Sequence, residues 1–138
     1  MKAQFSTLTT AILGVFLAAH TTVAQNSCTA VAYLGQIPPA GGSCTGQELG
    51  DASQNAPGFG RCEEVTNGSC ILTEAFEGAC AIHLYSDSNC NTPITGGNTI
   101  MCGDPPTNVN FNSFQVECCF RIVRLQPPLD PNPHVDVC

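Results

Sequence analysis

Basic and aromatic side chains are scarce in this sequence. It has no tryptophan, two tyrosines, and four lysine and arginine residues against eleven aspartate and glutamate residues, for a formal net charge of −7. Because like charges repel, such a chain is poorly suited to the phosphates of nucleic acids or to anionic lipid headgroups. We therefore expect neither nucleic-acid binding nor membrane insertion.

Long apolar runs are also scarce. One run of nine residues, 11–19, follows Lys2 and precedes Thr22-Val-Ala24, which places small side chains at the −3 and −1 positions of a signal-peptidase site. The run is shorter than the roughly 20 residues that span a bilayer. We predict a signal peptide over 1–24 and one secreted, extracellular domain over 25–138, a size that suits a single core.

Cysteine, by contrast, is abundant. All ten cysteines fall among the 114 residues after the signal, about 9% of them, which is typical of disulfide scaffolds. Cysteines of secreted proteins form disulfides, so we expect five bridges and no free thiol. The spacing does not show which cysteine is bonded to which. No C-x2-C spacing occurs and only His83 and His134 remain after the signal, so we expect no metal and no cofactor. The predicted bridging residues are Cys28, Cys44, Cys62, Cys70, Cys80, Cys90, Cys102, Cys118, Cys119 and Cys138.

Alternating and apolar segments predict an all-β chain. Residues 29–34 and 99–102 are short apolar runs, and in 80–85 Ile82 and Leu84 share one face while Ala81, His83 and Tyr85 share the other. Residues 114–123 have the strongest period of two. We predict a single disulfide-rich antiparallel domain, a β-sandwich or a Greek key-like fold.

The alternation over residues 114–123 also predicts which of these side chains are buried. Phe114, Val116, Cys118, Phe120 and Ile122 are expected to share a buried face, with Gln115, Glu117, Cys119 and Arg121 on the other. Cys118 and Cys119 should then bridge to different partners, one through the core and one across the outer face.

Three stretches are expected to lack strands. Residues 36–60, rich in Gly, Pro, Ser and Asn, predict a long loop pinned by Cys44 and Cys62, with one helical turn near 47–49. Asn67-Gly-Ser69 is a turn signal and a glycosylation sequon, so Asn67 should be exposed. Four prolines between 127 and 133 predict an extended tail over 125–138, tied back to the domain by Cys138.

The segment 79–117 resembles a βγ-crystallin-type Greek key unit. That family has a tyrosine in a folded hairpin, an aromatic residue five positions on, a glycine two after that and a serine 28 past the tyrosine; Tyr85, Cys90, Thr92 and Ser113 stand at these offsets. Tyr85 and Ser113 match, whereas Cys90 and Thr92 depart. The calcium-binding form of the family has a further motif that residues 108–113 lack, so calcium is not carried over.

As a whole the chain is similar to the small secreted cysteine-rich proteins of filamentous fungi, many of which act as effectors or elicitors on plants. The similarity is carried by the signal peptide, the even cysteine count, adjacent Cys118 and Cys119, and the segment Leu84-Tyr-Ser-Asp-Ser-Asn-Cys90. It implies action outside the producing cell, in the host apoplast, and it assigns no catalytic residue.

Candidate catalytic residues are few. His83, Glu117, Arg121 and His134 form the kind of set that a small secreted ribonuclease uses for proton transfer and phosphate binding, but the acidic chain opposes phosphate substrates. A glycosidase needs two carboxylates across a sugar cleft, for which Glu63, Glu64, Glu74 and Glu77 are candidates, but stacking aromatics are few. We predict that the protein is not an enzyme.

The prediction for function is therefore recognition. We expect a monomeric effector or elicitor that binds, or is recognised by, an extracellular host protein or cell-wall component through loops around 36–60 and 91–98. The main alternative is an antimicrobial or killer-toxin-like protein. Less favoured are a hydrolase and a protease inhibitor, which would use a rigid loop such as 36–43.

Overall fold

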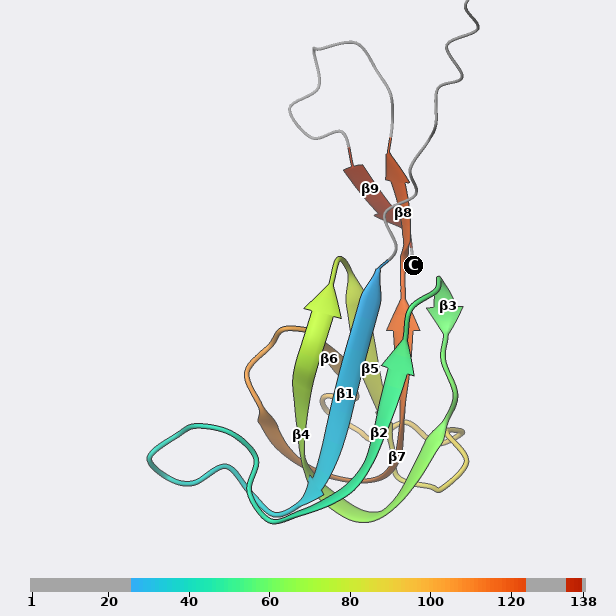
Figure 1. Cartoon of the computed structure of the whole chain (residues 1–138). Coiled ribbons are helices and arrows are strands. Elements are labelled where there is room, and N and C mark those ends of the chain that lie inside the picture. Colours follow the sequence, from blue (N-terminus) through green and yellow to red (C-terminus); the bar gives the residue numbers. More distant parts are fainter. Residues whose placement is uncertain (1–25, 124–133, 138) are drawn as a thin grey trace, which may run out of the picture.

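The protein is an all-β, disulfide-rich domain, as its sequence predicts. The computed structural model describes residues 26–123 and 134–137, and within these ranges it contains nine strands and no helix (Figure 1). The strands are β1 (Ser27–Leu34), β2 (Gln47–Gln54), β3 (Gly58–Phe59), β4 (Glu63–Glu77), β5 (Cys80–Tyr85), β6 (Thr99–Met101), β7 (Thr107–Cys118), β8 (Phe120–Val123) and β9 (His134–Val137).

Seven of the strands form one antiparallel sheet. Its order is β2-β1-β4-β7-β5-β6, with β3 pairing the end of β7, while β8 and β9 form a separate two-stranded sheet. The long sheet folds over, so that β5 and β7 lie behind β1, β2 and β4 (Figure 1). The two layers then bury their facing sides against each other.

Strand β4 belongs to both layers because it turns a corner. Its first residues pair with β7, with Glu63 opposite Phe114, and its last residues pair with β1, with Ile71 opposite Ala32. The register with β7 shifts on both sides of Gly68, and Asn67 takes a left-handed φ of 56°. The prediction of a turn at 67–69 is thus wrong. Because β4 pairs with β7 both before and after these residues, they form a bulge within one strand and not a hairpin turn between two.

The core lies between the two layers. On β1, Cys28, Ala30 and Ala32 alternate toward the inside, and their small size lets the second layer approach closely. Opposite them lie larger side chains of β5 and β7. These are Ile82, Leu84, Phe111, Phe114 and Val116, all at most 2% exposed.

The predicted loop over 36–60 is wrong in its second half. Residues 47–54 form β2, which pairs along its length with β1, and the helical turn expected at 47–49 is absent. The segment Gln-Glu-Leu-Gly-Asp-Ala-Ser-Gln is poor in β-forming residues. It becomes an edge strand because β1 supplies its hydrogen bonds, and Ala52 is its one buried residue.

The predicted single strand over 114–123 is also wrong. Phe114, Val116 and Cys118 are buried as expected, but β7 ends at Cys118 and Phe120 is 58% exposed. The backbone of Cys119 leaves the β7 ladder, since its N–H donates to Ala79 O at 2.9 Å and its carbonyl accepts from Asn26 Nδ2 at 2.8 Å. The next strand, β8, pairs with β9 instead, so Glu117 and Arg121 belong to different strands.

Four disulfides join described residues. They are Cys28–Cys102, Cys44–Cys70, Cys62–Cys90 and Cys80–Cys118. Cys80 and Cys118 are direct neighbours on β5 and β7, so this bridge runs within one layer. Cys119 is also disulfide-bonded, so adjacent Cys118 and Cys119 have different partners, as predicted; but Cys119 is only 2% exposed, so it does not lie on an outer face.

Part of the C-terminal segment forms a strand. Residues 134–137, which follow the last proline, form β9 rather than an irregular extended tail. The proline-rich segment 124–133 and Cys138 lie outside the described residues.

The corner of β4 gives a stability prediction. A Cβ built on Gly68 would lie 2.7 Å from the ring of Phe111, which is buried and packs edge-on against Phe114 at 6.0 Å. Because the ring cannot withdraw, we expect Gly68→Ala to lower the free energy of unfolding by about 1–3 kcal/mol. Thr66→Ala, at an exposed neighbouring position, is the control, and denaturant unfolding is the measurement. Equal stability of the two variants would contradict this packing.

Candidate functional site

Three connecting segments gather at one end of the folded sheet. They are the β1–β2 loop (35–46), the corner of β4 (66–69) and the β5–β6 loop (86–98), all at the lower end of the molecule (Figure 1). We call this the loop end. It contains two predicted binding segments, 36–46 and 91–98, whereas residues 47–54 and 58–59 of the predicted region are strands.

The β1–β2 loop is exposed at its tip and held at its base. Residues 38–43 are all exposed, while Cys44 is bridged to Cys70 of β4. The Ser69 hydroxyl accepts from Gly35 N at 2.8 Å and donates to Gly35 O at 2.7 Å, and Asn108 Oδ1 accepts from Ile37 N at 2.8 Å. These contacts fix the direction in which the tip projects.

The neck of this loop is narrow because glycines face each other across it. A Cβ on Gly35 would overlap the Thr45 carbonyl, and one on Gly46 would overlap the Leu34 carbonyl. Gly46 also has a φ of 95°, which glycine adopts without strain. At the tip, Gly41 N donates to Pro38 O at 2.8 Å, which closes a β-turn.

The β5–β6 loop is tied to β7 by a buried serine. The Ser113 hydroxyl, fully buried, donates to Asp87 O at 2.6 Å and accepts from Cys90 N at 3.1 Å, and Cys90 is bridged to Cys62. The loop folds back over Tyr85, whose backbone forms an isolated antiparallel β-bridge with that of Pro93. Tyr85 is therefore buried, although His83, on the same face of β5, is only partly buried.

The loop also perturbs two titratable groups. The pKa of Tyr85 lies above its ordinary value because burial, and then the carboxylates of Glu117 and Asp87, disfavour the phenolate. Desolvation raises the pKa of Asp87, but hydrogen bonds from the backbone of Asn91, Thr92 and Asn89 and from the Thr92 hydroxyl outweigh it. The net effect is a pKa below the ordinary value.

Asparagines at alternate positions of β7 connect the parts of the loop end. Asn108 holds the β1–β2 loop, while Asn112 accepts from Asn67 N at 3.3 Å and donates to Ser86 O at 2.7 Å. Asn110 between them is exposed. Sequence reasoning missed this role, although the alternation of Asn108, Asn110 and Asn112 with inward Val109 and Phe111 was a usable signal.

Two hollows open near these segments. The first, of about 420 Å³, is lined by Asn67, Gly68, Ser86, Asn110, Phe111 and Asn112. The second, of about 370 Å³, is lined by Arg61, Cys62, Glu63, Glu64, Ser88 and Asn89. The second hollow is lined mainly by charged, amide and hydroxyl groups, whereas the first combines amide and hydroxyl groups with Gly68 and the ring of Phe111.

The structure brings together two of the four predicted ribonuclease residues. His83 Nε2 lies 2.9 Å from Glu117 Oε2, His83 Nδ1 lies 3.3 Å from the Thr99 hydroxyl, and the Phe59 ring lies 5.3 Å from the imidazole. Arg121 lies in β8 and His134 begins β9, where they pair with Asp136 and Val123. Neither His83 nor Glu117 lines either hollow.

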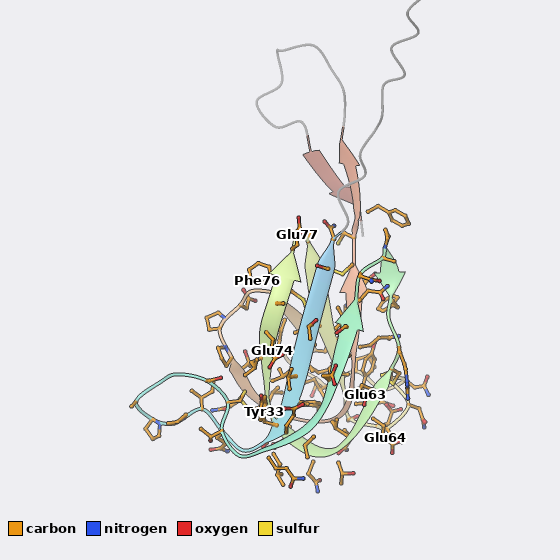
Figure 2. The ribbon with its side chains drawn as sticks, viewed as in Figure 1. Tyr33, Glu63, Glu64, Glu74, Phe76 and Glu77 are labelled. Carbon is orange, nitrogen blue, oxygen red and sulfur yellow. A yellow bond between two sulfur atoms is a disulfide. The ribbon has the colours of Figure 1, made fainter. Side chains whose placement is uncertain are left out.

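The predicted glycosidase carboxylates are separated. Glu63 and Glu64 line the second hollow beside Arg61. Glu74 and Glu77 lie farther along β4, with Glu77 near the end of the sheet opposite the loop end (Figure 2). Desolvation raises the pKa of Tyr33, and the carboxylates of Glu48 and Glu74 raise it further.

Comparison with known proteins gives no family assignment. No family model, curated protein or solved structure matches the chain. The described residues contain no helix long and apolar enough to cross a membrane. Within the same residues, no three His, Cys, Asp or Glu side chains are grouped so that they could hold a metal ion.

The lowered pKa of Asp87 gives a prediction about pH. Its carboxylate adds stability that is fully present above the ordinary pKa of 3.8 and is lost as the pH falls through the lower folded-state value. We expect Asp87→Asn to melt at a lower temperature than the wild type at pH 7, and the difference to shrink below pH 3.8. Asp51→Asn, at an exposed position of β2, is the control in calorimetry. A difference that widens on acidification would contradict the assignment.

The exposure of the bridges gives a prediction about reduction. Cys62 and Cys90 are half-buried, whereas every other described cysteine is at most 9% exposed. We expect graded addition of a thiol reductant, followed by alkylation and peptide mapping, to label Cys62 and Cys90 at the lowest concentration, because access limits thiol exchange. In denaturant this order should disappear. Earlier labelling of any other described bridge in the native protein would refute the prediction.

Proposed function

We propose that this protein is a secreted recognition protein, an effector or elicitor that acts outside the producing cell through its loop end. The observation that carries the proposal is the β1–β2 loop, whose exposed tip stands on a base fixed by the Cys44–Cys70 bridge and by the hydrogen bonds that Gly35 N and Ile37 N donate to Ser69 and Asn108. A loop held in one conformation loses little entropy when it binds, and rigid scaffolds commonly present function on such loops.

The chemistry of the tip suggests the kind of partner. Residues 36–43 carry no charged side chain and offer prolines, glycines and exposed backbone groups. Binding would therefore depend on shape and on main-chain hydrogen bonds rather than on charge. An extracellular host protein fits this description best, and a cell-wall component is the second choice.

The disulfides support an extracellular site of action. Four bridges among the described residues are typical of proteins that leave the cell, where bonds of this kind persist. They also limit local unfolding, on which proteolysis depends. Secretion itself is part of the proposal.

An antimicrobial or toxin-like function is the second candidate. Small bridged β-proteins can act in this way, but an excess of carboxylates over cations does not favour binding to anionic membranes. Such a protein would need a specific receptor, and the same loop end would serve it.

Inhibition of a protease and hydrolysis are weaker candidates. The hydrogen bond from Gly41 to Pro38 curls the tip into a turn, whereas a substrate-like inhibitor offers an extended segment. The His83–Glu117 pair has an imidazole and a carboxylate in contact, but it lines neither hollow.

The proposal is tested by infiltrating purified protein into leaf tissue. We expect the wild type to elicit a response, reduced and alkylated protein to elicit none, and a variant with Pro38→Ala and Pro39→Ala to need about tenfold more protein, equivalent to about 1.4 kcal/mol of binding. Glu77→Gln, exposed near the opposite end, is the matched control and should act like the wild type. Absence of a response in every host tested, together with inhibition of microbial growth, would favour the toxin-like function.

A further inference from the structure

Asn67 stands at the rim of the first hollow with its side chain unused. Asn67 is exposed at the corner of β4; its backbone N–H donates to Asn112 Oδ1, and within the described residues its side chain makes no hydrogen bond. We infer that Asn67 carries an N-linked sugar chain, and that the first sugar residue lies in the hollow lined by Gly68, Ser86, Asn110, Phe111 and Asn112. The inference rests on the secretion included in the proposed function.

The backbone at Asn67 suits a modified side chain. A φ of 56° is tolerated by asparagine better than by most residues, and the bulge removes this position from the regular ladder of β4. A sugar attached here displaces no strand pairing. The corner would keep its shape whether or not the chain is modified.

The contacts of the Ser69 hydroxyl, which belongs to the sequon, indicate that the sugar must be attached to Asn67 before the protein folds. In the folded protein the Ser69 hydroxyl is hydrogen-bonded to both the N–H and the carbonyl of Gly35, the residue that follows β1. A transferase that reads the Asn-x-Ser hydroxyl can reach it only before β1 and β4 are joined. Attachment therefore precedes folding, and the hollow then forms beside a sugar that is already present.

The hollow has the chemistry of a sugar site. The exposed carboxamide of Asn110 and the groups of Asn112 and Ser86 provide donors and acceptors, while Gly68 and Phe111 provide apolar surface for the C–H face of a sugar ring. Its volume of about 420 Å³ is within the range of small-ligand sites. Gly68 keeps this floor open, because it has no side chain over the Phe111 ring.

Packing of the first sugar predicts a stability gain that survives trimming. We expect the protein secreted by a eukaryotic host to melt about 2–5 °C higher than the same sequence refolded from bacteria with the same disulfides, and trimming to a single sugar to preserve that gain. Asn110→Ala should remove about half of the gain in the modified protein and leave the unmodified protein unchanged.

Peptide mapping identifies the modified residue. The peptide containing Asn67 should carry sugar in the wild type and in Ser69→Thr, which keeps both the sequon and the hydroxyl. Asn67→Asp should carry none, and since aspartate also tolerates this backbone conformation, it separates loss of sugar from strain. Ser69→Ala would remove the sequon and the Gly35 contacts together, so it does not replace Asn67→Asp.

Each outcome separates the parts of the inference. Secreted, fully bridged protein with unmodified Asn67 would overturn the sugar and leave the proposed function standing. The placement of the first sugar in the hollow would be overturned by either of two results. In one, trimming to a single sugar abolishes the gain in melting temperature; in the other, Asn110→Ala leaves that gain unchanged. Protein retained in the cell with free thiols would overturn secretion and the sugar together.

Discussion

The bend of β4 at Asn67 and Gly68 is the constraint on which the rest of the structure depends. Strand β4 pairs with β7 on both sides of the bend and with β1 only beyond it, so the two layers are parts of a single hydrogen-bonded sheet. The bend requires a left-handed residue and a neighbour without a side chain, because the Phe111 ring occupies that space. If this corner failed, the alanines of β1 would no longer face the large side chains of β5 and β7.

The two faces of β7 have separate functions. Val109, Phe111 and Phe114 point toward the core, whereas Asn108 and Asn112 reach outward to the loops. Asparagine suits this position because its carboxamide both donates and accepts, so that Asn112 holds the corner of β4 and the β5–β6 loop at once. Strand β7 therefore contacts all three segments of the loop end, in addition to the bonds of Ser69 and the two disulfides that hold the loops.

The disulfides reinforce pairings of distant segments. Cys28–Cys102 closes 74 residues and Cys80–Cys118 closes 38, and both lie at the core. Cross-links over long segments remove many conformations from the unfolded chain, which helps a small domain whose inward β1 residues are mostly alanine. Cys44–Cys70 and Cys62–Cys90 instead fix the loops that the proposed function uses.

Predictions from short-range pattern succeeded where one face of a segment is buried. The alternation of Ile82 and Leu84 placed β5 correctly, because period two directly reflects burial of alternate side chains. The same reasoning failed at Phe120, where the contacts of Cys119 with Ala79 and Asn26 end β7, and no local pattern reports such contacts. It placed Tyr85 on the face opposite Ile82 and Leu84 but did not predict that the β5–β6 loop folds back and buries Tyr85 there.

The sequence alone determined the all-β, disulfide-rich class, since cysteine content and strand alternation are local properties of the chain. It also indicated that Cys118 and Cys119 have different partners, although not for the predicted reason, since Cys119 lies beyond the end of β7 and is as buried as Cys118. Only the tertiary structure decided that residues 47–54 form an edge strand and that 67–69 bend a strand instead of ending it. Both depend on hydrogen bonds from distant strands, which can override weak local preferences and are invisible in the segments themselves.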